Sequence, residues 1–193
     1  MRKVVFLVLF YLSFLSAKAQ YYDIGLHTGL FTPIDFWYYV GGEIGPQAGL
    51  SFKYHFDDRL ALSSNYLRGG FGYSPALSEL RINGQRSGPE YTRVNVDIFS
   101  FIFHRKFALK NDWIISIGTG FGYYLENRNE RPVSIPDTNR QIFYRRDFTM
   151  PWNLNASKEI APNIIFGINS GVFLTPFYRL GGFHLGPSIS YRL

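Results

Sequence analysis

Apolar residues alternate with small or polar ones along the segment 113–126, which reads WIISIGTGFGYYLE. In a β-strand, successive side chains point to opposite sides, so this segment has one bulky apolar face and one thin, mostly polar face. A soluble protein would bury the apolar face, but glycines and a glutamate form a poor solvated surface. The pattern therefore favours a membrane-spanning strand whose apolar face meets lipid. The apolar phase consists of Trp113, Ile115, Ile117, Thr119, Phe121, Tyr123 and Leu125.

Similar alternation, bounded by turn signals, predicts seven more strands. In the segment 92–107 the phase is ambiguous. Val94, Val96 and Ile98 set one apolar phase, whereas Phe99 and Phe103 fall on the other, so either a bulge or a mixed interior is needed. Pro46, Pro151 and Pro187 remove donors from the strand ladder and leave the register near them open. The seven strands are expected at 22–31, 43–56, 59–67, 92–107, 147–156, 164–173 and 183–193.

The connections between these strands alternate long and short along the chain. This rhythm is typical of an up-and-down barrel with short periplasmic turns and longer outer loops, and an even strand count leaves both termini at the turn end. The sequence therefore predicts an all-β, closed, antiparallel transmembrane barrel of eight strands. Two aromatic belts are expected, one at each membrane interface. The turn-side belt is expected to include Tyr21, Tyr22, Phe56, Phe107, Trp113 and Tyr191, and the loop-side belt Trp37, Tyr123, Tyr124, Phe143 and Tyr178.

The N-terminus has the pattern of an export signal. Two basic residues precede an apolar run from Val4 to Leu15, and Ala17-Lys18-Ala19 forms a cleavage site. We expect residues 1–19 to be removed, leaving one barrel domain over 20–193; the alternative is a retained N-terminal anchor. Removal of this segment lowers the formal net charge from +6 to about +3. The basicity is therefore no argument for a nucleic acid partner.

The main alternative fold is a soluble exported barrel of the lipocalin type, with a polar exterior and an apolar interior. In that arrangement charged residues such as Lys53 and Asp147 would face solvent. The large aromatics would then have to fill a narrow eight-stranded interior, which cannot hold them all. The chain has no cysteine, so neither fold could rely on disulfides or thiolate metal sites.

The C-terminal segment FHLGPSISYRL places Leu185, Ile189, Tyr191 and Leu193 on one phase. This ending resembles the signal by which outer-membrane barrels are recognised by their assembly machinery. Together with the AKAQ export boundary and the loop rhythm, the whole mature chain resembles the family of small porin-like outer-membrane barrels, including PorT-type members. It is similar in size to the OmpA and OmpX barrels. The resemblance implies an outer-membrane location, contact with the assembly machinery, and an envelope or secretion partner that the sequence does not identify.

Polar residues predicted to face inward form the first candidate site. Charges buried in a narrow barrel must pair, so these residues are expected to fill the lumen with ion pairs and hydrogen bonds. The alternative is a narrow path for water or solutes, which would make the protein a small porin-like channel. The predicted lumen network comprises Glu43, Lys53, Arg93, Asp97 and Asp147, with Asp23, His27, His55, Glu126, His184 and Arg192 as further candidates.

Arginines around the predicted loop 127–142 form the second candidate site. The guanidinium group matches phosphate geometry, so these side chains could bind the phosphates of surrounding lipopolysaccharide. Acidic residues lie among them, and ordinary solvated loop charge is the alternative interpretation. The candidate residues are Arg128, Arg131, Arg140, Arg145 and Arg146.

A barrel enzyme that modifies lipid A is a further alternative. His184, Ser188 and Ser190 share a phase, but His184 and Ser188 are about 13 Å apart along a strand and cannot bond directly. A partner would have to come from a neighbouring strand, for example His27 or Asp23. No metal spacing, cofactor motif or catalytic signature is present in the sequence. We therefore expect a non-enzymatic barrel, without a cofactor, that has a structural or interaction role in the outer membrane.

Overall fold

The computed structural model describes residues 21–35, 43–73, 81–82, 85–86, 92–130, 141–177 and 180–193. The predicted signal peptide, residues 1–19, lies outside this part of the chain. Within the described ranges no helix is both long and apolar enough to cross a bilayer. A single turn of 3-10 helix, Lys110–Asp112, connects two strands.

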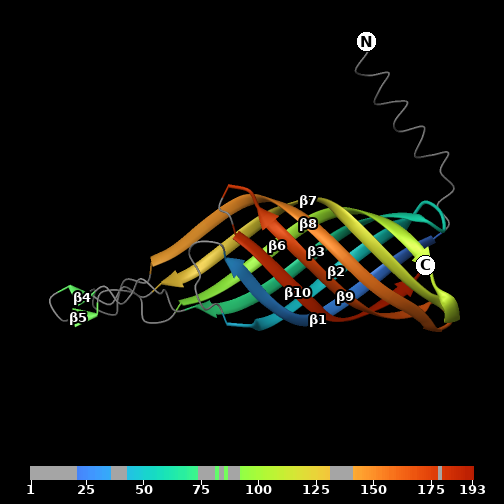
Figure 1. Cartoon of the computed structure of the whole chain (residues 1–193), viewed down its shortest axis with the longest axis horizontal. Coiled ribbons are helices and arrows are strands. Elements are labelled where there is room, and N and C mark those ends of the chain that lie inside the picture. The colour runs from blue at the N-terminus through green and yellow to red at the C-terminus, as the bar shows by residue number, and fades with distance from the viewer. Residues whose placement is uncertain are drawn as a thin grey trace, which may run out of the picture.

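Eight long strands form one closed barrel, and every neighbouring pair is antiparallel (Figure 1). Each strand pairs with its predecessor in the barrel, and the first and last strands close the ring. Ile24 lies opposite Tyr191 and Asp35 opposite Leu180 along this seam. The predicted fold class is confirmed. The strands are β1 (Tyr21–Asp35), β2 (Gly45–His55), β3 (Leu60–Tyr73), β6 (Thr92–Ala108), β7 (Trp113–Glu130), β8 (Gln141–Ala161), β9 (Ile164–Thr175) and β10 (Leu180–Arg192).

The strands run further toward the loops than the sequence predicted. β3 ends at Tyr73, and β7 and β8 occupy part of the segment 127–142 that was expected to be a loop. A short hairpin, formed by β4 (Arg81–Ile82) and β5 (Gln85–Arg86), lies beyond the loop end of the barrel (Figure 1). Polar residues at these strand ends concealed the continued pairing, because a strand that leaves the membrane no longer needs an apolar outer face.

The outer surface of the barrel is apolar around its middle. Ile117 and Phe121 of β7 are 54% and 57% exposed, and Phe101 and Phe103 of β6 stand beside them on the same surface. A water-soluble barrel does not expose a continuous apolar surface of this kind, whereas lipid favours it. The lipocalin-type alternative is therefore wrong.

β6 is regular through the region where the sequence was ambiguous. Its pairing with β3 continues without interruption from Arg105 to Thr92, so the possible bulge is absent. Instead, both faces change character along the strand. The inner face passes from Lys106 and His104 at the turn end to Val96 and Val94 at the loop end. The mixed interior is thus the alternative that the structure adopts.

Two of the three prolines coincide with interruptions in the ladder. The pairing of β1 with β10 skips the positions around Pro187, and that of β7 with β8 skips those around Pro151. Proline has no N–H to donate, so a gap in the ladder accommodates it. Pro46, by contrast, lies at the start of β2 opposite Leu30.

Candidate functional site

The half of the lumen nearest the loops is filled by apolar side chains, which we call the apolar plug. The ring of Phe31 stacks on Phe71 and on Phe173 with centroids 5.9 and 5.8 Å apart, and Tyr124 lies 5.7 Å from Phe173. The predicted polar network therefore does not extend through the whole lumen. The plug comprises Phe31, Leu67, Phe71, Val94, Val96, Ile98, Tyr124 and Phe173.

Acidic groups lie beside the plug, since Glu126 is in register with Val96 and Asp147 with Tyr124. The Tyr124 hydroxyl donates to Oε2 of Glu126 at 2.7 Å, and both residues are buried. Asp147 is also buried, and its Oδ1 accepts the N–H of Phe148 at 2.6 Å. Because Tyr124 faces the lumen, its predicted place in the loop-side aromatic belt is wrong.

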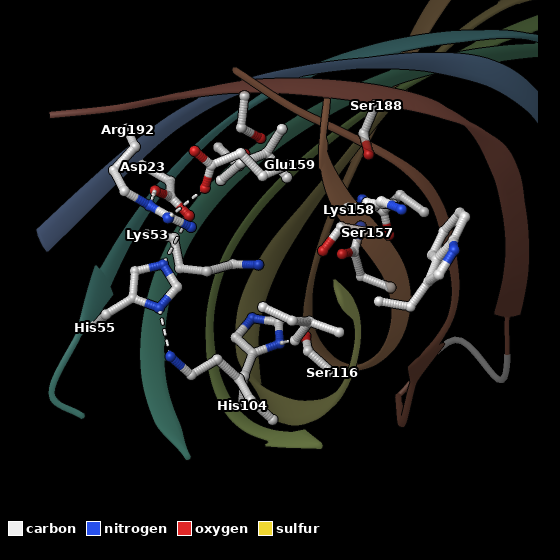
Figure 2. Close-up of a pocket in the computed structure, with 18 of the residues that line it drawn as sticks. Asp23, Lys53, His55, His104, Ser116, Ser157, Lys158, Glu159, Ser188 and Arg192 are labelled. Atoms are coloured by element: carbon white, nitrogen blue, oxygen red, sulfur yellow. Dashed lines mark hydrogen bonds and ion pairs between the residues drawn. The ribbon is translucent and has the colours of Figure 1, made fainter. Parts of the chain in front are cut away.

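The other half of the lumen contains a cavity of about 710 Å³, which we call the turn-end cavity (Figure 2). It reaches from His27 and Asn169 near mid-barrel to the turn residues Leu109, Asp112 and Ala161. All eight barrel strands contribute to its wall. The cavity is therefore built by the whole barrel and ends beneath the plug.

A chain of hydrogen bonds and ion pairs crosses one side of this cavity (Figure 2). Lys106 Nζ donates to Nδ1 of His55 at 3.0 Å, and Nε2 of His55 lies 2.8 Å from Oδ2 of Asp23. Arg192 bridges Oδ1 of Asp23 at 3.4 Å and Oε2 of Glu159 at 2.8 Å. Since the Lys106 ammonium can only donate, this network assigns the His55 proton to Nε2, from which it donates to Asp23.

Tyr21 completes this network. Its ring stacks on His55 at 4.1 Å and lies 4.3 Å from the Arg192 guanidinium carbon. Lys106 also donates to the Tyr21 hydroxyl at 3.1 Å and to the Asp57 carbonyl at 2.7 Å. Tyr21 therefore faces the lumen, and its predicted position in the turn-side aromatic belt is wrong.

Lys53 lines the same cavity but is not part of this chain of hydrogen bonds and ion pairs. Figure 2 shows its side chain extending into the open middle, and none of the described residues forms a hydrogen bond or ion pair with its Nζ. Asp23 is in the same wall, but its two oxygens are engaged by His55 and Arg192. Lys53 thus presents an ammonium group to the cavity contents.

A buried serine–histidine pair lies next to Lys53, because Ser63 is the register partner of Lys53 on β3 and His104 belongs to the adjoining strand β6. Ser63 Oγ and His104 Nε2 are 2.7 Å apart, and Ser116 Oγ lies 3.3 Å from Nδ1 of His104. Asn65 Nδ2 also donates to Ser63 Oγ at 2.8 Å. Ser63 is only 1% exposed and does not line the cavity, so its hydroxyl is closed to a substrate in this conformation.

His27 and His184 stack at mid-barrel, with ring centroids 6.4 Å apart. The absence of side chains at Gly49 and Gly171 leaves space for these two imidazoles. Nε2 of His27 and Nδ1 of His184 have no hydrogen-bond partner among the described residues. His27 lies opposite Ser188 in the strand register, but no hydrogen bond joins them, so the structure does not form the cross-strand pair that the catalytic alternative would require.

The five residues of the predicted lumen network have different locations. Lys53 lines the turn-end cavity and Asp147 is buried beside the plug, so both face the lumen as predicted. Asp97 is on the outer face, where its Oδ1 accepts from the Tyr66 hydroxyl at 2.6 Å and lies 3.9 Å from Nε of Arg68. The inward prediction for Asp97 is therefore wrong. Glu43 precedes β2 and is exposed, so it is not part of a buried network. The side chain of Arg93 lies outside the described residues.

The sequence interpretation also missed members of the turn-end cavity, above all His104 and Lys106. Their phase is the same as that of Val94 and Val96, whereas Arg93 and Asp97, on the opposite phase, were predicted to face inward. The signal that could have found them is the row of phenylalanines on the opposite phase, which marks the true outer surface.

The predicted arginine group is only partly described. Arg146 is exposed on the outer side of β8, whereas Arg145 is half-buried on the lumen side. Arg131 and Arg140, and the side chain of Arg128, lie outside the described residues. Among the described residues, no group of three or more His, Cys, Asp or Glu side chains is arranged to hold a metal ion.

The closed ring of eight antiparallel strands and the apolar exterior define the class of eight-stranded transmembrane barrels found in bacterial outer membranes. Solved structures of that class match the chain at low sequence identity. Neisserial surface protein A superposes with a TM-score of 0.61 at 10% identity, covering 89% of this chain and 97% of that one. Ail of Yersinia pestis, in complex with the heparin analogue sucrose octasulfate, gives 0.56 at 10% identity, covering 90% and 98%.

OprG of Pseudomonas aeruginosa gives a TM-score of 0.52 at 10% identity, covering 88% of this chain and 95% of that one. At these identities the likeness establishes the fold and not the activity. No protein-family model and no curated protein matches the sequence.

Proposed function

We propose that the protein is a closed, non-conducting barrel of the bacterial outer membrane with a structural or interaction role. The apolar plug is the observation that carries this proposal. An ion passing from the turn-end cavity to the loops would have to lose its water among Phe31, Phe71 and Phe173, without polar partners to replace it. Close packing of this layer supports a seal and argues against the porin-like alternative.

The membrane location and orientation belong to the same proposal. The apolar exterior favours lipid, and the export signal predicted over residues 1–19 supports transfer to the envelope. Short turns face the periplasm in bacterial barrels of this kind. The turn-end cavity would then open toward the periplasm and the plug would lie nearer the cell exterior.

Conductance measured in planar bilayers tests the seal. We expect no stable current steps from the purified wild-type protein. The double variant Phe31→Ala/Phe173→Ala is expected to produce measurable steps because it removes two of the stacked rings. Phe101→Ala, which removes a ring from the lipid face, is the matched control and should remain silent. Stable steps from the wild-type protein would overturn the proposal in favour of a channel.

Lipopolysaccharide contact is the interaction that a described residue supports. Arg146 is exposed on the outer side of β8 toward the loop end, where outer-leaflet phosphates would be found. Arg146→Ala should reduce co-purified lipopolysaccharide. Arg105→Ala, an exposed arginine at the turn end of β6, should not. Equal retention in both variants would remove this interaction from the proposal.

A further inference from the structure

The turn-end cavity combines an unpaired ammonium with a wall of amides and hydroxyls. We propose that it binds a small anionic, hydroxyl-rich solute, with a carboxylate or phosphate against Lys53 and the hydroxyls against the asparagines and serines of the wall. The volume of about 710 Å³ falls in the range of small-molecule sites. This proposal goes beyond the sealed-barrel function, because a dead-end cavity can bind a solute without conducting it.

The charge distribution favours an anion. The cavity is lined by four cationic side chains, Lys53, Lys106, Lys158 and Arg192, and by three carboxylates, Asp23, Asp112 and Glu159. Asp23 and Glu159 are already bound to Arg192, and Lys106 uses its donors on Tyr21, His55 and Asp57. Lys53 therefore retains its donors for a bound molecule.

The position of Lys53 makes this excess charge effective. Its ammonium extends into the interior of the cavity and not onto the outer surface (Figure 2). A low-dielectric wall around such a cleft concentrates the electric field and attracts counter-ions. A lysine that forms no hydrogen bond or ion pair inside a barrel contributes little to the fold, because the attraction of Asp23 offsets its desolvation only in part. Binding of an anion would give Lys53 a role, whereas its contribution to the fold does not explain its presence.

The neutral part of the wall indicates hydroxyl groups on the ligand. Asn153 and Asn169 are hydrogen-bonded to each other at 2.7 Å, but Asn155 has no hydrogen-bond partner among the described residues. Ser157, Ser188 and Ser190 face the same space. Amide and hydroxyl groups both donate and accept, which suits a polyhydroxylated molecule such as a sugar acid or a sugar phosphate.

Calorimetric titration of the intact, detergent-solubilised protein tests the proposal with three probes. Glucose 6-phosphate and glucuronate distinguish a phosphate from a carboxylate, and glucose is the neutral control. We expect saturable binding of at least one anionic sugar and at least tenfold weaker binding of glucose. Binding should also weaken as salt is raised from 50 to 500 mM, because the added anions compete with the sugar for the Lys53 ammonium and screen the attraction between them.

Variants of the wall assign the site. Lys53→Met should weaken binding of the anionic sugar at least tenfold, and Lys53→Arg should largely retain it. Lys110→Met, which removes a lysine from the adjoining turn and not from the cavity, should have no effect. Asn155→Ala should weaken binding without changing its salt dependence. A heat-dependent gel shift confirms that each variant is folded before titration.

Failure of the binding proposal and failure of the sealed-barrel function give different results. Absence of saturable binding for both anionic sugars, equal binding of glucose, or unchanged affinity in Lys53→Met would each overturn the proposal. Conductance of the wild-type protein would overturn the sealed-barrel function but leave these titrations interpretable, since they do not depend on current.

Discussion

At the scale of single residues, small side chains decide which larger ones can enter the lumen. Gly118 is the clearest case, because a Cβ built there would lie 2.6 Å from Nδ1 of His104 and 2.7 Å from Cγ2 of Ile102. His104 is held by its hydrogen bond to Ser63 and cannot move aside without losing it. The glycine at this position is therefore required by the imidazole of the neighbouring strand.

Gly118→Ala should lower the free energy of unfolding by about 1–3 kcal/mol, because an overpacked interior must shift to accept the methyl group. Urea-dependent unfolding in lipid vesicles, followed by tryptophan fluorescence, measures this change. Gly70→Ala is the matched control, since its Cβ would find its nearest neighbour at 3.4 Å. A Gly118→Ala loss no larger than that of Gly70→Ala would contradict the packing argument.

Asp57 shapes the turn between β2 and β3. Its Oδ1 accepts the backbone N–H groups of Arg59 and Leu60, each at 2.6 Å. These two hydrogen bonds favour the ionised carboxylate and lower the pKa of Asp57 from 3.8. Their contribution to the turn is therefore complete above the unfolded-state pKa and is lost as the pH falls through the lower, folded-state pKa.

An NMR titration of the Asp57 carboxyl carbon in micelles should give a pKa below 3.8. Asp57→Asn, whose amide oxygen can still accept, should keep protection of the Arg59 and Leu60 amides without titrating in this range. Asp57→Ala should lose that protection at every pH. A measured pKa at or above 3.8 would show that the two hydrogen bonds are absent in solution.

At the scale of the strand, the outer face is apolar around the middle of the barrel, whereas the inner face is polar toward the turns and apolar toward the loops. Phe101 lies at the middle of β6, opposite Ser64 of β3 and Phe121 of β7. Its ring is 5.8 Å from that of Phe121 and half exposed on the outer surface. This position belongs to the apolar band that faces hydrocarbon.

Phe101→Arg should therefore lower stability by about 2–4 kcal/mol, the cost of an arginine near the bilayer midplane. Tyr144→Arg, at the exposed loop end of β8, should cost only about 0–1 kcal/mol because it lies near or beyond the interface. Denaturant titration in vesicles of defined lipid compares the two. Equal losses would mean that Phe101 does not face the membrane core.

The predictability of each strand depended on whether its two faces differed along their whole length. β7 was assigned correctly from sequence, because its outer phase is bulky from Trp113 to Tyr123 and its inner phase is mostly small. β6 could not be assigned, because Val94 and Val96 pack in the plug while Asp97 lies outside. An apolar residue in a barrel strand can face lipid or a dry lumen, and periodicity alone does not distinguish them.

The candidate site was predictable only in part for the same reason. Four cavity residues lie on strands whose inner phase is clear, so the sequence predicted correctly that they face the lumen. These residues are Asp23, Lys53, His55 and Arg192. Their mutual arrangement depends on the barrel register, which places Asp23 opposite both Lys53 and Arg192. His104 and Lys106 were not predicted, because the inner and outer faces of β6 could not be told apart from the sequence.

At the scale of the whole molecule, the two ends of the barrel differ in connection length, exposure and contents. Both ends of the described barrel, Tyr21 and Leu193, lie at the turn end (Figure 1). Because the sequence contains no cysteine, a single introduced thiol reports its own position without background. The chain is therefore suited to a labelling test of orientation.

Phe177→Cys, at a loop-end position that is 80% exposed, should react with a membrane-impermeant maleimide on intact cells. Asp58→Cys, in the turn between β2 and β3, should react only after the outer membrane is permeabilised. The reverse pattern would invert the proposed orientation and would turn the cavity toward the cell exterior.

The apolar plug also has a kinetic consequence. Phe31 lies on β1 and Phe173 on β9, so their stacking joins segments that are far apart in the chain. Contacts of such large sequence separation form late, because a long loop must close before they can contribute. Docking of these rings is thus coupled to arrival of the final strands, and an unfinished barrel should remain permeable until the moment of closure.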